Sequence, residues 1–191
     1  MKQLILILIS AAIVNNVVLS QFLGLCPFLG VSKKVNTAAG MGGSVIFVVT
    51  LSSLVTGLIH DFILKPLGLD YLNTIVFILV IAALVQFIEM FLKKYVKNLY
   101  KSLGIYLPLI TTNCCVLGTA LNIVDYKYNV GTGTLYGFGV SAGFAIAIIL
   151  MAGVREKIED NDIPHAFHGT GIVVLTAGLM AIAFFGFSGI I

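Results

Sequence analysis

Three cysteines are the residues of this 191-residue chain whose type and placement could support metal or redox chemistry. Cys26 lies within Gly24-Leu25-Cys26-Pro27-Phe28-Leu29-Gly30, and the adjacent pair Cys114 and Cys115 lies within the segment 112–118. Aligning Cys26 with Cys114 places cysteine, leucine and glycine at the same offsets, whereas aligning it with Cys115 loses the downstream matches. This similarity indicates that Cys26 and Cys114 occupy equivalent positions in two halves of the chain.

These thiols have a limited set of chemical uses. Three cysteines do not make a disulfide framework, and a buried free cysteine commonly acts as a small apolar residue, which is our interpretation of Cys115. For Cys26 and Cys114, the repeated placement favours metal ligation. Iron–sulfur clusters usually take four thiolates, and structural zinc sites also take four ligands. Two ligands from this chain therefore imply two from another protein chain.

The composition indicates the environment in which these cysteines work. Hydrophobic residues make up 59% of the chain and charged residues only 10%, with a mean hydropathy of +1.09. A soluble domain carries roughly a quarter of its residues as charges, so an ordinary soluble domain is excluded. Six apolar runs are each long enough to cross the bilayer as a helix: Leu4 to Leu25, Gly40 to Leu64, Leu72 to Leu92, Leu103 to Ile123, Gly133 to Val154, and Gly171 to Ile190. The sequence thus predicts a single all-α membrane domain over 1–191, without a separate soluble domain.

Basic residues predict the orientation of these spans. Eight of the eleven bases follow the first, third and fifth runs, and the other three lie in the opposite loops: Lys33, Lys34, Lys93, Lys94, Lys97, Lys101, Arg155 and Lys157, against Lys2, Lys65 and Lys127. By the positive-inside rule, we expect a multi-pass protein with both termini on the outer side. No basic patch extends beyond these short loops, so nucleic acid is not an expected partner. A signal peptide is the alternative interpretation of the first run, which lacks a clear cleavage site.

The two halves of the chain also predict an internal symmetry. Each half, about 1–100 and about 101–191, holds three spans, so the second must enter the bilayer from the opposite side as an inverted repeat. Pro27 disfavours helix at Cys26, and Pro108 with the segment 111–113 interrupts the fourth span before Cys114. The sequence therefore predicts six transmembrane helices in two inverted three-helix repeats, with broken first and fourth helices whose ends bring Cys26 and Cys114 together. Glycine-rich starts follow in both halves, at 40–43 and 131–133, and would allow close helix packing.

Other polar residues suggest weaker alternatives. His165 and His168 lie in a charged loop that could bind a metal, although a solvated loop is the more ordinary interpretation. Inverted repeats with broken helices also build small transporters or channels without a redox cofactor. The only polar residues that could line such a pathway are Asn15, Asn16, Thr111, Thr112 and Asn113. They could equally cap the half-helices or form hydrogen bonds to cluster sulfurs. A purely structural scaffold is the third interpretation, for which the cysteines would be replaceable.

Three segments carry a specific resemblance to a known family. These are the stretch 22–34 around Cys26, the segment Leu109-Ile110-Thr111-Thr112-Asn113-Cys114, and the ending Gly186-Phe187-Ser188-Gly189. Together they resemble the A subunits of Rnf electron-transport complexes and, across the whole chain, the related E subunits of sodium-pumping NADH:quinone reductases. The proline after Cys26 is more typical of the Rnf members.

The resemblance implies a function, a cofactor and a set of partners. It implies a component of a ferredoxin:NAD oxidoreductase in a bacterial or archaeal cytoplasmic membrane, coupled to Na⁺ or H⁺ transport, with no complete active site of its own. A homologous six-helix E subunit would share one [2Fe-2S] cluster inside the membrane, and the B, C, D and G subunits would complete the assembly. Carried over to this sequence, the cluster ligands are Cys26 and Cys114, and Cys115 is not one.

Overall fold

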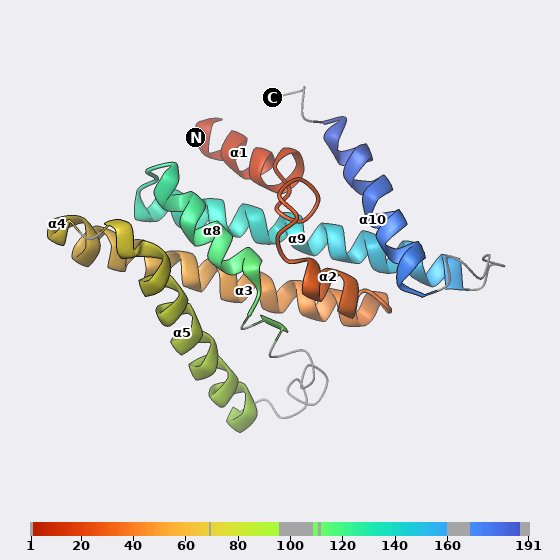
Figure 1. The fold of residues 1–191 in the computed structure, drawn as a ribbon, viewed down its shortest axis with the longest axis horizontal. Coiled ribbons are helices and arrows are strands. Elements are labelled where there is room, and N and C mark those ends of the chain that lie inside the picture. Colours follow the sequence, from red (N-terminus) through yellow and green to blue (C-terminus); the bar gives the residue numbers. More distant parts are fainter. Residues whose placement is uncertain (1, 69, 96–108, 111, 160–168, 188–191) are drawn as a thin grey trace.

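A computed structural model describes residues 2–68, 70–95, 109–110, 112–159 and 169–187, and their regular elements are helices (Figure 1). Two of the short elements, η1 and η2, are π-helical, and η3 is a 3₁₀ turn. The bounds are α1 Lys2–Ile9, η1 Ser10–Val14, α2 Leu25–Val31, α3 Val35–Ile59, η2 His60–Leu64, α4 Lys65–Leu67, η3 Asp70–Leu72, α5 Asn73–Tyr95, α8 Cys114–Asp125, α9 Val130–Glu159 and α10 Thr170–Phe185.

Several of these helices are apolar enough to cross a membrane. By length and composition, candidate spans are Val35–Leu64, Asn73–Met90 and Val130–Ile158, and shorter apolar helices cover Cys114–Asp125 and Thr170–Phe185. Large side chains on their outer surfaces are apolar and exposed, among them Phe62, Leu79 and Ile182. Such a surface is unfavourable in water and suits hydrocarbon. The prediction of an all-helical protein with several membrane-type helices is confirmed.

An antiparallel pair, α3 and α9, forms the centre of the fold. A Cβ built on Gly42 of α3 would lie 3.0 Å from the Cβ of Ala145, and one built on Gly57 would lie 3.8 Å from Val130. The start of α3 therefore packs on the second half of α9, and the end of α3 packs on its beginning. Small residues let the two backbones approach closely, as in other membrane helix pairs. Of the glycine-rich starts, Gly42 and Gly133 make close contacts, whereas Gly40, Gly43 and Gly131 face open space.

Two short helices lie against this pair and point in opposite directions. In Figure 1, α2 and α8 begin near the middle of the α3–α9 pair, and α2 runs toward the end of α9 while α8 runs toward its beginning. Arg155 near the end of α9 donates from Nη1 to the carbonyl of Leu29 and to Oγ of Ser32, 2.9 and 2.8 Å away. The C-terminal end of α2 is thereby joined to the C-terminal end of α9. The basic loops after the first and fifth runs thus lie at the same end of the molecule.

The first apolar run is broken, but not where the sequence suggested. Helical structure stops at Val14, residues 15–24 form an irregular segment, and Cys26 and Pro27 both lie inside the first turn of α2. The prediction that Pro27 disfavours helix at Cys26 was wrong. A helix leaves its first amides without intrahelical acceptors, so a proline in the first turn removes no hydrogen bond. In the fourth run, residues 112–113 are non-helical and α8 begins at Cys114, whereas 103–108, including Pro108, and Thr111 lie outside the described residues.

Asn16 compensates for the break in the first run. Its buried side chain donates from Nδ2 to the carbonyls of Ala12, at 3.1 Å, and Gly143 of α9, at 2.9 Å. Its Oδ1 accepts from the backbone amides of Val18 and Leu19, at 3.1 and 3.4 Å. A broken helix inside a membrane leaves polar backbone groups that lipid cannot satisfy, so a buried amide side chain supplies the missing partners.

We expect Asn16→Ala to destabilise the protein strongly, because it leaves two buried amides without their side-chain acceptor. The expected cost is about 2–4 kcal/mol, since each unsatisfied buried group costs roughly 1–3 kcal/mol. Thermal unfolding of the purified protein in detergent measures the change. Asn15→Ala is the matched control, because Asn15 is exposed and its side chain makes only a 3.4 Å contact with Oγ of Ser10. Equal unfolding temperatures for the two variants would contradict this role of Asn16.

Candidate metal centre

Asn113 determines how the two adjacent cysteines are presented. It is the N-cap of α8, and its Oδ1 accepts a hydrogen bond from the backbone amide of Cys115 at 3.0 Å. Asparagine is among the preferred N-cap residues because its side chain satisfies an amide at the open helix end. With the helix started in this way, Cys114 is exposed and Cys115 is buried.

The segment before Cys26 lies directly against Cys114. The backbone amide of Gly24 donates to Sγ of Cys114, with 2.9 Å between nitrogen and sulfur. Gly24 has a φ of +78°, a left-handed conformation that glycine adopts without strain. Only one residue separates Gly24 from Cys26, and two residue steps span at most about 7 Å. The tertiary structure therefore brings the surroundings of Cys26 and Cys114 together, although 88 positions separate them in the sequence.

Leu23 and Gly118 also hold the segment before Cys26 against α8. A Cβ built on Gly118 would lie 2.5 Å from Cδ1 of Leu23, so the leucine side chain packs directly against the glycine. The amide of Leu23 also donates to the carbonyl of Val17 at 3.0 Å. The irregular segment is thus held on α8 immediately before it reaches Cys26.

Exposure along the two short helices agrees at five of the six positions compared. Over residues 26–31 the side chains are exposed, buried, buried, half-buried, exposed and buried. Over residues 114–119 they are exposed, buried, buried, half-buried, half-buried and buried. An alignment of Cys26 with Cys115 would instead match an exposed thiol with a fully buried one. The structure thus agrees with the sequence offset that pairs Cys26 with Cys114.

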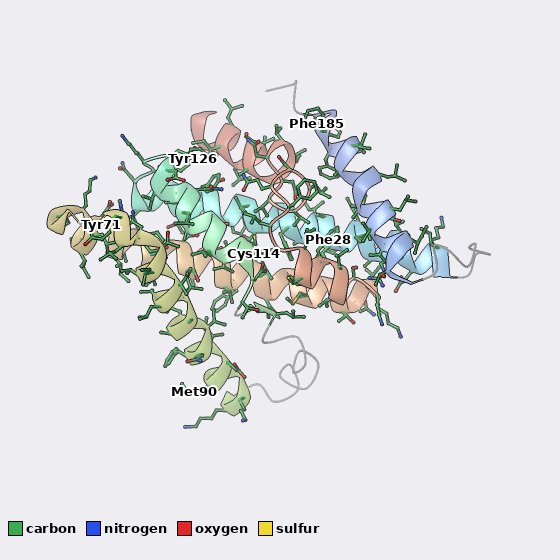
Figure 2. The ribbon with its side chains drawn as sticks, viewed as in Figure 1. Phe28, Tyr71, Met90, Cys114, Tyr126 and Phe185 are labelled. Atoms are coloured by element: carbon green, nitrogen blue, oxygen red, sulfur yellow. The ribbon has the colours of Figure 1, made fainter. Side chains whose placement is uncertain are left out.

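The site lies at mid-length of the long helix α9. A Cβ on Gly24 would lie 3.0 Å from the ring of Phe144, the fifteenth residue of this 30-residue helix. A helix of this length measures about 45 Å, so its midpoint is far from either end. In Figure 2, Cys114 and Phe28 lie in the central part of the molecule, away from Tyr71 and Met90. The two exposed thiols are therefore remote from both polar ends of α9.

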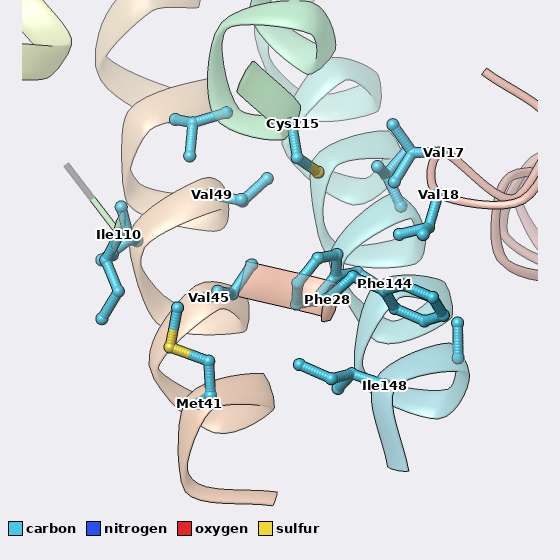
Figure 3. Packing of buried hydrophobic residues seen from close by; sticks show 14 of the residues in the cluster. Val17, Val18, Phe28, Met41, Val45, Val49, Ile110, Cys115, Phe144 and Ile148 are labelled. Atoms are coloured by element: carbon cyan, nitrogen blue, oxygen red, sulfur yellow. The ribbon is translucent and has the colours of Figure 1, made fainter. Parts of the chain in front are cut away.

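Cys115 belongs to the hydrophobic core. Its side chain is fully buried, and Figure 3 shows it beside Val49, Val17 and Val18. This environment fits its interpretation as a small apolar residue. The same core joins α2, α3 and α9 around the site through Phe28, Met41, Phe144 and Ile148.

The donor set fits a thiolate-bound group that needs ligands from elsewhere. Within the described residues, no three His, Cys, Asp or Glu side chains lie close enough to hold a metal ion. Cys26 and Cys114 are exposed thiols, and the sulfur of Cys114 already receives an amide hydrogen bond. Such N–H donors to sulfur are typical of iron–sulfur ligation. His165 and His168 lie outside the described residues.

The sequence indicated that Asn16 and Asn113 could cap the broken helices, but it did not reveal that Gly24 and Gly118 also position the two thiols. Asn16, Gly24, Asn113 and Gly118 orient the broken segments through contacts that only the folded chain reveals. Asn113 had a readable signal, since asparagine before an apolar run is typical of an N-cap. The role of Gly24 had none, because its partner Cys114 is distant in sequence.

These features define a class of protein: an apolar helical membrane protein in which two segments that contact each other each carry an exposed thiol. A family model described as "Rnf-Nqr subunit, membrane protein" matches residues 4–191, and the chain belongs to this family. The chain is 58% identical over 186 residues, covering 97% of both chains, to the A subunit of the Na⁺-translocating ferredoxin:NAD⁺ oxidoreductase complex of Acetobacterium woodii.

Two further relatives match over nearly their full length. The A subunit of the ion-translocating oxidoreductase complex of Glaesserella parasuis is 52% identical over 191 residues, covering 100% of this chain and 99% of the relative. The corresponding protein of Vibrio campbellii is 51% identical over 191 residues, covering 100% of both chains. The relatives are thus named as components of oxidoreductase complexes that translocate ions. The resemblance identified from the segments around the cysteines is confirmed at the level of the family.

Proposed function

We propose that this chain is the A-type membrane component of an ion-translocating ferredoxin:NAD⁺ oxidoreductase, and that it relays electrons through a [2Fe-2S] cluster inside the membrane. Cys26 and Cys114 supply two of the four thiolate ligands. A homologous six-helix E subunit supplies the other two, and the B, C, D and G subunits complete the complex. The observation that carries the proposal is the hydrogen bond between Gly24 and Cys114, which joins two segments that each present an exposed thiol.

Phe22 supports coverage of this surface by a protein partner. Its side chain is 61% exposed, and its φ of +56° is unusual for a residue other than glycine. The neighbouring contacts of Leu23 and Gly24 hold it in that conformation. A rigid exposed aromatic is a good anchor for an interface because little side-chain freedom is lost on binding. A cluster bound here would also need protein cover, since lipid offers no ligands.

The arrangement of the short helices supports the inverted repeat. α2 and α8 start at mid-length of α9 and run to opposite ends, as expected for half-helices that enter the bilayer from opposite faces (Figure 1). We infer six transmembrane helices, with both termini on the outer side of the cytoplasmic membrane. The contact of Arg155 with Ser32 supports a shared side for two of the basic loops.

The chain contributes to electron transfer by holding the cluster ligands in place within the membrane. When bound, the cluster would accept and release single electrons; the chain holds its two thiols at mid-depth and surrounds them with apolar side chains. A carrier at mid-depth divides a crossing of about 30 Å of hydrocarbon into two shorter steps. The free-energy drop of electron transfer between ferredoxin and NAD⁺ would drive Na⁺ or H⁺ across the membrane through the complex as a whole.

The transporter alternative has less support in the described residues. The side chain of Asn16 and Oδ1 of Asn113 are engaged with backbone groups. A cavity of about 350 Å³ in the described part of the chain is lined by apolar residues, including Ile9, Ile146 and Phe184. Such a lining offers no ligand to an ion.

Iron analysis of the membrane pair tests the proposal. We expect this chain, purified together with its six-helix partner, to carry two irons and two acid-labile sulfides per pair. Either protein expressed alone should carry none, because each offers only two thiolates. Full iron content in the isolated chain would refute the shared cluster, and a pair without iron would favour the transporter alternative.

A further inference from the structure

We infer that the backbone amide of Gly24 tunes the reduction potential of the group bound by Cys114. This inference rests on the proposed function and assigns a role to Gly24, which is not itself a ligand. The amide nitrogen lies 2.9 Å from Sγ of Cys114. The Sγ of Cys26 accepts no hydrogen bond within the described ranges, so the two ligands of this chain differ in their surroundings.

The local geometry holds this donor in place. A Cβ on Gly24 would lie 3.0 Å from Phe144, 3.2 Å from Oδ1 of Asn113 and 3.2 Å from the Cβ of Cys115. Its left-handed φ of +78° is also unfavourable for a side chain. Position 24 therefore accepts glycine alone without strain, and the amide cannot turn away from the sulfur while the segment keeps this conformation.

The chemistry gives the direction of the effect. Reduction of a [2Fe-2S] cluster adds one electron and no proton, so the ligating sulfurs become more negative. A hydrogen-bond donor stabilises the more negative state more strongly, which raises the reduction potential. At mid-length of α9 the surroundings are apolar, and low dielectric strengthens such an interaction. Loss of the Gly24 donor should consequently make the cluster harder to reduce.

Gly24→Ala tests this inference, with Gly30→Ala as the matched control. Gly30 lies in α2 just beyond the cysteine, and a Cβ there would have no atom within 4 Å. Both variants are prepared as the intact complex and titrated potentiometrically, with the EPR signal of the membrane cluster as readout. Alanine keeps the backbone N–H, but its Cβ would crowd Phe144 and Cys115 at an unfavourable φ, so the segment must shift and carry the amide away from Sγ of Cys114. At the potential where the native cluster is half reduced, we therefore expect the reduced-to-oxidised ratio to fall about tenfold in Gly24→Ala, as the loss of a charge-assisted hydrogen bond predicts. Gly30→Ala should match the native ratio.

A milder variant keeps the inference testable if Gly24→Ala does not assemble its cluster. Leu23→Ala would remove the side chain that packs against Gly118 and loosen the segment that carries the Gly24 amide. We expect a smaller shift in the same direction. A retained signal with the native ratio in Gly24→Ala, or in Leu23→Ala where the first variant lacks a signal, would overturn the inference. The absence of any membrane-cluster signal in the native complex would instead overturn the proposed function.

Discussion

Replacing either Cys26 or Cys114 by alanine should abolish the EPR signal of the membrane cluster and the electron transfer that depends on it. Each substitution removes one of the four proposed ligands, and the thiol of Cys115, which lies next to Cys114 in the sequence, is buried in the core. A [2Fe-2S] cluster requires a full ligand set, so we expect complete loss rather than partial occupancy. EPR spectroscopy and iron analysis of the purified complex measure the outcome.

Cys115→Ala is the control for this experiment. Its sulfur is fully buried in the core, so the substitution removes a small apolar group at a cost of about 1 kcal/mol and leaves both exposed thiols in place. The signal should therefore persist. A signal that survives Cys114→Ala but disappears with Cys115→Ala would show that Cys115, and not Cys114, is the ligand. A signal that survives all three substitutions would remove this chain from the cluster.

Gly143→Ala should have the largest effect on stability among single-methyl additions. A Cβ at this position would lie 2.4 Å from the carbonyl oxygen of Ala12, with two further backbone atoms of Ala12 at 2.9 and 3.0 Å. Backbone cannot rotate away as a flexible side chain does, so the broken first segment must separate from α9. Overpacking of this kind costs about 3 kcal/mol. It would also stretch the bond between Asn16 and the carbonyl of Gly143.

Gly153→Ala separates this clash from the general effect of alanine in a helix. Gly153 lies in the same helix, and a Cβ there would meet no atom within 4 Å. Alanine is favoured over glycine within helices by up to about 1 kcal/mol, so we expect the control to be neutral or slightly stabilised. Thermal unfolding in detergent should show a clear drop in unfolding temperature for Gly143→Ala alone. Equal unfolding temperatures would mean that η1 does not pack on α9 at Ala12 and Gly143.

The membrane character of the chain was readable from the sequence, and the sequence also predicted that Cys26 and Cys114 form the pair. Long apolar runs report a lipid environment without any knowledge of the fold, because composition alone decides which solvent a helix surface tolerates. The repeated offset selected Cys114 over Cys115, and the exposure of the two thiols now agrees with it. Family membership followed from the same segments, because the residues around the cysteines are specific.

The location of the first break was decided by tertiary structure. Pro27 suggested an interruption at Cys26, yet a proline in a first helical turn is compatible with helix, and the irregular segment lies at 15–24 instead. That segment persists because the side chain of Asn16 accepts from the backbone amides of Val18 and Leu19 and donates to the carbonyl of Gly143 on α9.

The sequence by itself determined that this protein belongs in a membrane and which two thiols are equivalent, since composition and repeat offset are properties of the chain alone. Only the tertiary structure decided that an amide at Gly24 meets the sulfur of Cys114, and that both thiols are exposed at mid-length of α9. Such contacts depend on how two half-helices are packed against a third. The spacing of these residues in the sequence does not reveal that packing, because each close approach is made by residues that are far apart along the chain.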